Sequence, residues 1–287
     1  MNTLRSWLGP ILAVIALLSY AAAAQPPVPT LTFKTVTVPG ATSTVVYGIS
    51  NANSLAGSYI DKAGKSHGFM LAGKTLTTID DPNGVATFCL AVNSSGSVAG
   101  YYTTANFEAQ AFLYQGGTFT DIAPSGSLGS QALGINDHGV ISGNFADAVG
   151  VHGFSFDGTT YTTIDVPGAV YTLGGGISNA GVLTEVWLDD ESDSESSIYN
   201  GSQFKTVNAP GAEDSSAGGI SSVGDVVYSL EDEDDNYHGA LRIQGHYITF
   251  DVPDSTRTFG YGINDNHVIV GAFVSTSGVT EGYEATY

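Results

Sequence analysis

The sequence predicts an all-β fold: a six-bladed β-propeller of four-stranded blades. Three observations predict it. One unit of about 43 residues recurs six times, each unit divides into four short strand candidates, and the two ends of the array are offset by one strand. Helical periodicity is absent from this array, which forms one domain over residues 31–287.

Two independent markers set the period. The first is a Gly-Ile-Asn-like tripeptide with steps of 43, 43, 42, 43 and 43 residues, beginning at Gly48, Ala91, Gly134, Gly176, Gly219 and Gly262. The second is a proline, at Pro39, Pro82, Pro124, Pro167, Pro210 and Pro253. Two markers that keep one period through six copies indicate a repeated supersecondary unit.

The third copy shows how a unit divides into strands. Its candidates are residues 130–136, 140–145, 152–156 and 161–166. Asp-His-Gly and Asp-Gly turns separate them, because glycine adopts positive φ freely and Asp bonds its own backbone. Four strands per unit is typical of a propeller blade, whereas the coils of a β-solenoid are usually shorter.

The ends of the array predict how the ring closes. Residues 31–39 match the fourth strand of a unit, and residues 281–287 match the third. The last blade therefore lacks its outer strand, and we expect the N-terminal strand to pair there. Such pairing removes an open sheet edge that would favour aggregation.

The N-terminus predicts export. Residues 1–24 read as a signal peptide with one charge, Arg5, an apolar stretch over residues 8–18 and a small-residue cleavage site at 22–24. The apolar stretch is shorter than the roughly 20 residues of a membrane-spanning helix. Residues 25–30 form a short linker. We expect a monomer that is secreted to the periplasm or the extracellular medium, with no membrane span after cleavage.

Composition narrows the partners. The chain has 8 Lys and Arg against 28 Asp and Glu, a net charge of −20. It lacks the cations that neutralise phosphates, so we expect no nucleic-acid partner. Cys89 is the only cysteine, which excludes an intramolecular disulfide, and its apolar surroundings indicate a buried, inert thiol.

The units resemble the HAF-repeat family of extracellular bacterial proteins, whose repeats carry a His-Ala-Phe-like tripeptide and a Gly-Ile-Asn-x-x-Gly turn. The tripeptide stands here at residues 67–69 and 152–154, with a weaker copy at 238–240, and the turn stands at residues 134–139. The resemblance implies an exported repeat protein and assigns no catalytic residues. The other copies replace the histidine by Gln110, Ser196 and Glu281. We therefore expect His67, His152 and His238 to make structural hydrogen bonds.

The fourth and fifth copies depart from the repeat in the second strand. Glu185 and Tyr228 stand where the other copies have glycine, and Trp187 stands where most have Tyr or Phe. Sugars stack on aromatic rings and glycosidases use carboxylate pairs, so we predict that these three residues bind a ligand. Core packing in divergent blades is the alternative.

The same two copies carry acidic loops between their second and third strands. The acidic residues are Asp189, Asp190, Glu191, Asp193 and Glu195 in the fourth copy, and Glu231, Asp232, Glu233, Asp234 and Asp235 in the fifth. A propeller places such equivalent loops of adjacent blades side by side. Ca²⁺ prefers oxygen ligands, so a calcium site is one prediction and a solvated acidic patch is the other.

No nucleophile elbow, phosphate-binding loop or His-Glu-x-x-His motif occurs in the sequence. We therefore expect a non-enzymatic binding or cell-surface structural protein that acts through the loops of one propeller face. Its expected partner is a glycan or a cell-surface protein. We expect no cofactor unless the acidic loops bind Ca²⁺. Two alternatives stay open: a glycan hydrolase or lyase with a carboxylate site near blades four and five, and a calcium-dependent adhesion module.

Overall fold

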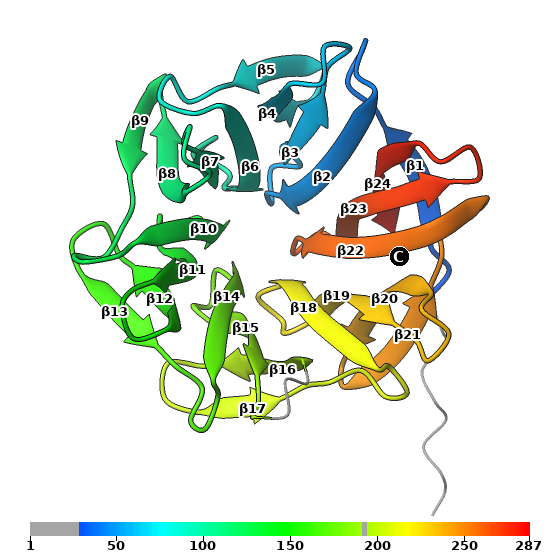
Figure 1. The fold of residues 1–287 in the computed structure, drawn as a ribbon. Helices are drawn as coiled ribbons and strands as arrows, with labels where there is room; N and C mark the ends of the chain where they lie inside the picture. The colour runs from blue at the N-terminus through cyan, green and yellow to red at the C-terminus, as the bar shows by residue number, and fades with distance from the viewer. Residues whose placement is uncertain (1–28, 191–193) are drawn as a thin grey trace, which may run out of the picture.

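The computed structural model describes residues 29–190 and 194–287. The predicted signal peptide and most of the linker lie outside these residues. The described chain forms 24 strands and no helix. The strands make six four-stranded antiparallel sheets around a central axis (Figure 1), which confirms the six-bladed propeller. Within the described ranges, no helix is long and apolar enough to cross a membrane.

Five blades each consist of four consecutive strands, ordered from the axis outward. Blade one is β2 (Ser43–Ile49), β3 (Leu55–Ile60), β4 (Ser66–Ala72) and β5 (Thr75–Ile79). Blade two is β6 (Ala86–Val92), β7 (Val98–Thr103), β8 (Ala109–Gln115) and β9 (Thr118–Asp121). Blade three is β10 (Gly129–Ile135), β11 (Ile141–Ala146), β12 (Val151–Phe156) and β13 (Tyr161–Ile164). Blade four is β14 (Tyr171–Ile177), β15 (Leu183–Leu188), β16 (Ser194–Tyr199) and β17 (Phe204–Thr206). Blade five is β18 (Asp214–Ile220), β19 (Val226–Glu231), β20 (Tyr237–Ile243) and β21 (His246–Phe250).

Blade six combines the two ends of the chain. It consists of β22 (Ser255–Ile263), β23 (Val268–Ser275), β24 (Thr280–Thr286) and, as outer strand, β1 (Thr32–Val36). In Figure 1, β1 (blue) lies beside β24 (red). The pairing runs antiparallel from Thr32 opposite Thr286 to Val36 opposite Gly282. Closure by the N-terminal strand is thus confirmed.

The side chains of β1 reinforce this closure. Lys34 donates a hydrogen bond of 2.6 Å to the Glu284 carboxylate. On the other face, the Phe33 ring packs 5.9 Å from the ring of Tyr283. Val36 is buried in an apolar cluster with Val46 and other core residues. Apolar burial stabilises this strand more than the surface ion pair does.

The inner strands of neighbouring blades touch through their backbones at the axis. A Cβ on Gly176 would lie 2.9 Å from the Gly219 Cα, and one on Gly219 would lie 3.0 Å from the Gly262 Cα. A Cβ on Gly262 would in turn lie 2.7 Å from the carbonyl oxygen of Tyr47. The glycine of the repeat marker is therefore required by contact between blades. Ala91 is the one exception among the six marker positions.

The turns after the inner strands link each blade to the next. The Asn93 and Asn136 side chains donate to the backbone carbonyls of the equivalent residues one blade on, at 3.2 and 3.1 Å. Asn264 does the same to Ser50, at 2.9 Å, and so joins the last blade to the first. The Asn of the marker tripeptide thus stabilises the ring at this end of the axis.

A carboxylate in two of these turns makes further bonds between blades. Asp137 accepts hydrogen bonds from the Ser94 backbone, at 2.7 Å, and from the Asn179 side chain, at 2.8 Å. Burial raises the pKa of Asp137, but these hydrogen bonds outweigh it, so the pKa lies below its usual value. Asp265 accepts equivalent bonds from Ser222. Both carboxylates are used in holding the ring closed.

The axial contact is testable by adding one methyl group. Gly219→Ala should lower the free energy of unfolding by about 1–3 kcal/mol, because the new Cβ meets the backbone of blade six. The measurement is urea denaturation followed by circular dichroism. Gly150→Ala is the matched control, since its nearest neighbour would be 3.8 Å away. Equal stability of the two variants would contradict the packing argument.

The closing strand allows a second test with variants of equal charge. Val36→Asp should lower the free energy of unfolding by about 2 kcal/mol or more, because it buries an unpaired carboxylate. Thr35→Asp, one residue earlier and at an exposed side chain, should change it by about 0.5 kcal/mol or less. Thermal denaturation of the two proteins gives the comparison. A larger effect of Thr35→Asp would show that β1 does not pack as described.

Candidate functional site

The six inner strands enclose an axial cavity of about 230 Å³. Its described lining consists of apolar side chains, glycine and alanine residues, and two tyrosines, with no charged side chain. One end is bounded by a ring of branched side chains, which we call the collar: Ile49, Val92, Ile135, Ile177, Ile220 and Ile263.

The collar lies at the end of the cavity where the inner strands finish. The same six side chains also line a polar pocket of about 50 Å³ among the turns beyond them. In that pocket the polar groups already bond to one another. For example, the Asn51 side chain donates to Asp265 at 2.8 Å. The collar thus lies between the larger cavity and this turn pocket.

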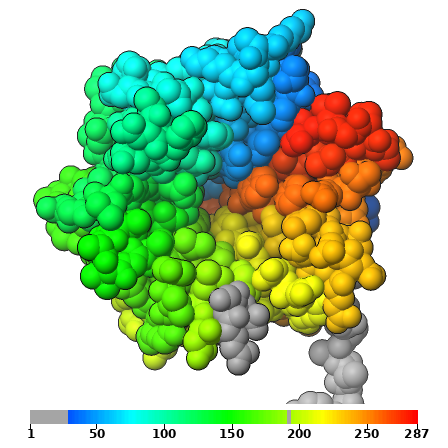
Figure 2. All heavy atoms as spheres, in the orientation of Figure 1, coloured from blue at the N-terminus to red at the C-terminus, as the bar shows by residue number. Residues whose placement is uncertain are grey.

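The open end lies at the beginning of the inner strands. Ser43, the first residue of β2, pairs with Ile60, which directly precedes the loop between β3 and β4. The cavity thus faces the same side of the ring as the loops between second and third strands. The space-filling view shows the blades meeting around a central hollow (Figure 2).

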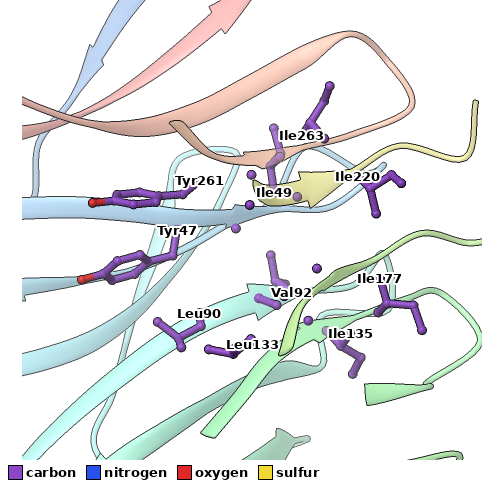
Figure 3. A pocket seen from close by; sticks show the side chains of 18 of the residues that line it. Tyr47, Ile49, Leu90, Val92, Leu133, Ile135, Ile177, Ile220, Tyr261 and Ile263 are labelled. Atoms are coloured by element: carbon purple, nitrogen blue, oxygen red, sulfur yellow. The ribbon is translucent and has the colours of Figure 1, made fainter. Parts of the chain in front are cut away.

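Two tyrosines form one wall of the cavity. The rings of Tyr47 and Tyr261 lie 5.3 Å apart, one from blade one and one from blade six. Both hydroxyl groups point away from the isoleucines of the collar (Figure 3). Burial raises the pKa of both phenol groups, so they stay neutral; the Tyr47 hydroxyl also shares a hydrogen bond with the Ser58 side chain.

The aromatic wall continues outward. Phe259 lies parallel to Tyr261, with ring centroids 6.1 Å apart, and Tyr237 lies 5.3 Å from Phe259. We call Tyr237, Phe259, Tyr261 and Tyr47 the aromatic stripe; each ring is partly exposed. The Arg257 guanidinium covers Tyr237 at 5.1 Å, which places a hydrogen-bond donor at the outer end of the stripe.

The wall contributed by blades four and five has no side chains of this kind. Gly175 and Gly218 occupy the position before the marker glycine, where Tyr47 and Tyr261 stand in blades one and six. The two tyrosines were not identified from the sequence. The position directly before the marker residue varies among the six copies: it is Tyr in two, Leu in two and Gly in two. This variation at one repeat position could have indicated a site formed by the tyrosines.

The predicted residue Tyr228 fills the core between blades four and five. In four blades the second-strand glycine lies opposite an aromatic residue of the third strand, in the pairs Gly57–Phe69, Gly100–Phe112, Gly143–Phe154 and Gly271–Tyr283. Blade five exchanges the two sizes, because Tyr228 lies opposite Ala240. Tyr228 is fully buried, and its hydroxyl donates to the Val207 carbonyl of blade four at 2.9 Å. Its ring therefore takes the place of the missing third-strand aromatic.

Glu185 replaces the aromatic residue of blade four with a carboxyl group. It lies opposite Ser197, is fully buried, and has its Oε2 beside Gly153 of blade three. Both carboxyl oxygens and the Ser197 hydroxyl lack hydrogen-bond partners among the described atoms. Burial, aided by the nearby Asp165 carboxylate, raises the pKa of Glu185 well above its ordinary value. Burial of this group in the fold thus favours the protonated acid.

The structure does not bring the three predicted ligand-binding residues together. Glu185 faces blade three, whereas Tyr228 faces blade four. Trp187 follows Glu185 on β15 and is only partly buried, and its indole N–H has no partner among the described atoms. Neither Glu185 nor Tyr228 lines the axial cavity. A ligand-binding role for these residues stays a prediction.

The acidic loops are used in part by their own turns. Asp232 accepts hydrogen bonds from the backbones of Asn236 and Asp234, both at 2.9 Å. The bonds from Asn236 are the main cause that lowers the pKa of Asp232 to about 2. In the other loop, Glu195 accepts a bond from the Asn208 side chain. Glu191 and Asp193 lie outside the described residues.

A calcium site at these loops remains a prediction. Over residues 29–190 and 194–287, no group of three or more His, Cys, Asp or Glu side chains is placed to hold a metal ion. The remaining predicted ligands are distributed over two loops, one of which is described only in part: Asp189, Asp190, Glu231, Glu233, Asp234 and Asp235.

The histidines of the repeat each lie between two aspartates. His67 is 2.8 Å from Asp80 and 3.4 Å from Asp61, and thus links the loop after β3 to the segment after β5. His152 and His238 repeat this arrangement in blades three and five. Strand register corrects one expected equivalence: Glu195, opposite Trp187, occupies the histidine position in blade four, and Ser196 does not. The loop before β16 has the same length as the equivalent loop of blade one, since Trp187 and Glu195 are as far apart in the chain as Tyr59 and His67; the loop that is one residue shorter precedes His152 in blade three.

The buried Cys89 is confirmed as a core residue. Its side chain is fully buried, and burial raises the pKa of its thiol well above the usual value. It lies against the space beside Gly68, where a Cβ would approach its sulfur to 2.6 Å. The thiol therefore packs between blades one and two.

Protonation of Glu185 predicts how stability depends on pH. Because its folded-state pKa lies above the unfolded value of about 4.3, the wild-type fold loses stability as pH rises from that value towards the folded pKa. Glu185→Gln removes this loss, so its advantage in unfolding free energy should grow between pH 4 and pH 8. Each unit of pKa elevation is equivalent to about 1.4 kcal/mol.

Urea denaturation at several pH values measures this difference. Glu213→Gln, at an exposed carboxylate, is the control for the change in net charge. An advantage of Glu185→Gln that is the same at every pH would show that the carboxyl group titrates normally in the fold.

Comparisons with known proteins support the architecture. No family model matches the chain, and no curated protein matches it. Among solved structures, the SapL1 lectin in complex with α-methyl fucoside is similar with a TM-score of 0.57 and 14% identity, over 85% of this chain and 92% of that chain. The six-bladed fucose-recognising lectin of Aleuria aurantia has a TM-score of 0.53 and 13% identity, over 88% and 93%.

A third similar structure is TolB from Acinetobacter baumannii, with a TM-score of 0.56 and 12% identity. The match covers 87% of this chain and 65% of the TolB chain. At these identities the likeness extends to the fold alone. The chain thus has the six-bladed propeller architecture that fucose-binding lectins also use.

Proposed function

We propose that this protein is a secreted, non-enzymatic glycan-binding protein that acts through one face of its propeller. The observation that carries the proposal is the aromatic stripe, which leads from the rim of that face into the axial cavity. The N-terminal signal sequence supports export, and glycans are a major class of partner outside the cell.

The chemistry of the stripe suits a sugar. The C–H face of a pyranose ring stacks on the face of an aromatic ring, while its hydroxyl groups need donors and acceptors at the edge. Tyr47 and Tyr261 offer both, since each combines a ring with a neutral hydroxyl. The similar fold of fucose-binding lectins supports a propeller as a scaffold for glycan binding.

The geometry favours binding over turnover. Canonical glycosidases place two carboxyl groups about 5–9.5 Å apart across the bond that they cleave. The described lining of the cavity carries none, and Glu185 is enclosed between blades three and four. Binding by ring stacking and neutral hydroxyl groups needs neither a carboxylate nor a metal ion.

A glycan array probed with residues 25–287 tests this function. Binding should be detected, and Phe259→Ala or Tyr261→Ala should weaken it about tenfold, the loss expected when one stacking partner is removed. Phe204→Ala is the matched control, because it removes a partly exposed ring that stacks on Tyr199 in the outer part of blade four. Thermal denaturation establishes that each variant folds. Absence of binding to every glycan, or unchanged affinity in both stripe variants, would contradict the proposal.

A further inference from the structure

We infer that the axial cavity receives a single uncharged sugar ring at the end of a glycan, inserted end-on toward the collar. This inference rests on the proposed glycan binding and specifies which part of a glycan is recognised. It follows from the volume of the cavity, the buried side chains of the collar, the lack of charge in the lining and the placement of its tyrosines.

The size of the cavity limits its occupant to one ring. Pockets for drug-sized ligands start at about 300 Å³, and this cavity measures about 230 Å³. One pyranose ring is smaller than such ligands, whereas a disaccharide is comparable to them. Only one sugar unit therefore fits, and the rest of the glycan lies outside, along the aromatic stripe.

The collar decides that this ring must be terminal. Five of its six side chains are buried, including Val92 and Ile220, and all six line both the cavity and the turn pocket behind it. Their close packing leaves a narrow passage, so we expect no glycan chain to thread through and no ring with neighbours on both sides to enter. A ring with a single linkage can enter with its free edge against the collar.

The lack of charge decides that the ring must be neutral. A carboxylate or ammonium group in this lining would lose its hydration and find no opposite charge, which is costly. Anionic sugars are further disfavoured by the net charge of −20. Uronic acids and other acidic sugars are therefore excluded from the cavity.

The two walls of the cavity have different roles. Tyr47 and Tyr261 provide ring faces and hydroxyl groups. On the side of blades four and five, the carbonyl oxygens of Gly175 and Gly218 already accept bonds from Ser142 and Thr184, at 2.7 and 2.5 Å. Specific hydrogen bonds to the sugar are thus expected mainly from the tyrosine side, and the glycine side provides space.

Space on the glycine side is fixed by packing. A Cβ on Gly175 would lie 2.4 Å from the Thr184 hydroxyl, and one on Gly218 would lie 2.5 Å from the Tyr261 carbonyl. Side chains are therefore excluded at both positions for reasons of the fold. The resulting room opposite the tyrosines is what a flat ring requires.

The test compares single sugars with and without charge. Isothermal titration and ligand-observed NMR would use methyl α-L-fucoside, methyl α-D-glucoside, methyl α-D-galactoside and methyl α-D-glucuronide as probes. At least one neutral glycoside should bind within about tenfold of the best oligosaccharide on the array, and the glucuronide should bind at least tenfold more weakly than that glycoside. Equal or stronger binding of the glucuronide would overturn the inference.

Variants that fill the cavity test the location. Leu90→Phe and Leu133→Trp enlarge lining side chains of blades two and three without altering the stripe, and each should lower affinity at least tenfold. Leu128→Trp, at a side chain 65% exposed, is the matched control. Overpacking can impair folding, so the melting curve of each variant is compared with that of the wild type. The sugar affinity of the milder variant, Leu90→Phe, decides the test when its melting curve matches.

The outcomes separate this inference from the function on which it rests. Glycan binding that is lost in Tyr261→Ala but unchanged in both filling variants overturns the cavity and leaves the proposed function intact. Binding confined to polymers, with no neutral methyl glycoside bound, does the same. Absence of all glycan binding overturns both. Loss of binding in the filling variants, with the control unchanged, supports the inference.

Discussion

The architecture depends on the close approach of six backbones at one axis. At five of the six marker positions an inner strand meets the next with no room for a side chain, as the contacts from Gly176 through Gly219 to Gly262 show. Because the ring closes, a change in one blade displaces its neighbours on both sides. Turn residues such as Asn264 then join the blades by hydrogen bonds at the end of the axis. The repeated glycine in the sequence is the consequence of one steric condition that holds at five of the six blades.

Away from the axis, the paired residues of the second and third strands that fill the space between blades differ from one blade to another. A large residue and a small one share each interblade space, and blade five shows that either strand can supply the large one, since Tyr228 faces Ala240. Blade four uses the same space for Glu185 and Ser197 and leaves their polar atoms without partners. The departure of blade five from the repeat is thus explained by a swap of the large and the small residue between two paired strands. Such a swap does not explain why blade four has a carboxyl group at Glu185.

The fold was predictable from the sequence because its signals are periodic. Two markers predicted the length and the number of the blades. The offset between residues 31–39 and 281–287 predicted that the ring closes by pairing of β1 with β24. The cavity was not predictable in this way, because each blade contributes single residues such as Tyr47 and Tyr261 that are far apart in the chain. Their importance depends on a shared distance from the axis, which strand periodicity does not reveal. Likewise, only the strand register identified Glu195, and not the expected Ser196, as the counterpart of the repeat histidine.

The pairing of β1 with β24 has a mechanical consequence. Thr32 lies opposite Thr286, so both chain ends leave the last blade at the same end of an antiparallel pair. Tension applied through the two ends would therefore break the bonds of this pair one after another, as in unzipping, and would not load them all at once in shear. Because β1 is bonded to β24 alone, stretching between both ends would open the ring at this pair before it disturbs the other blades.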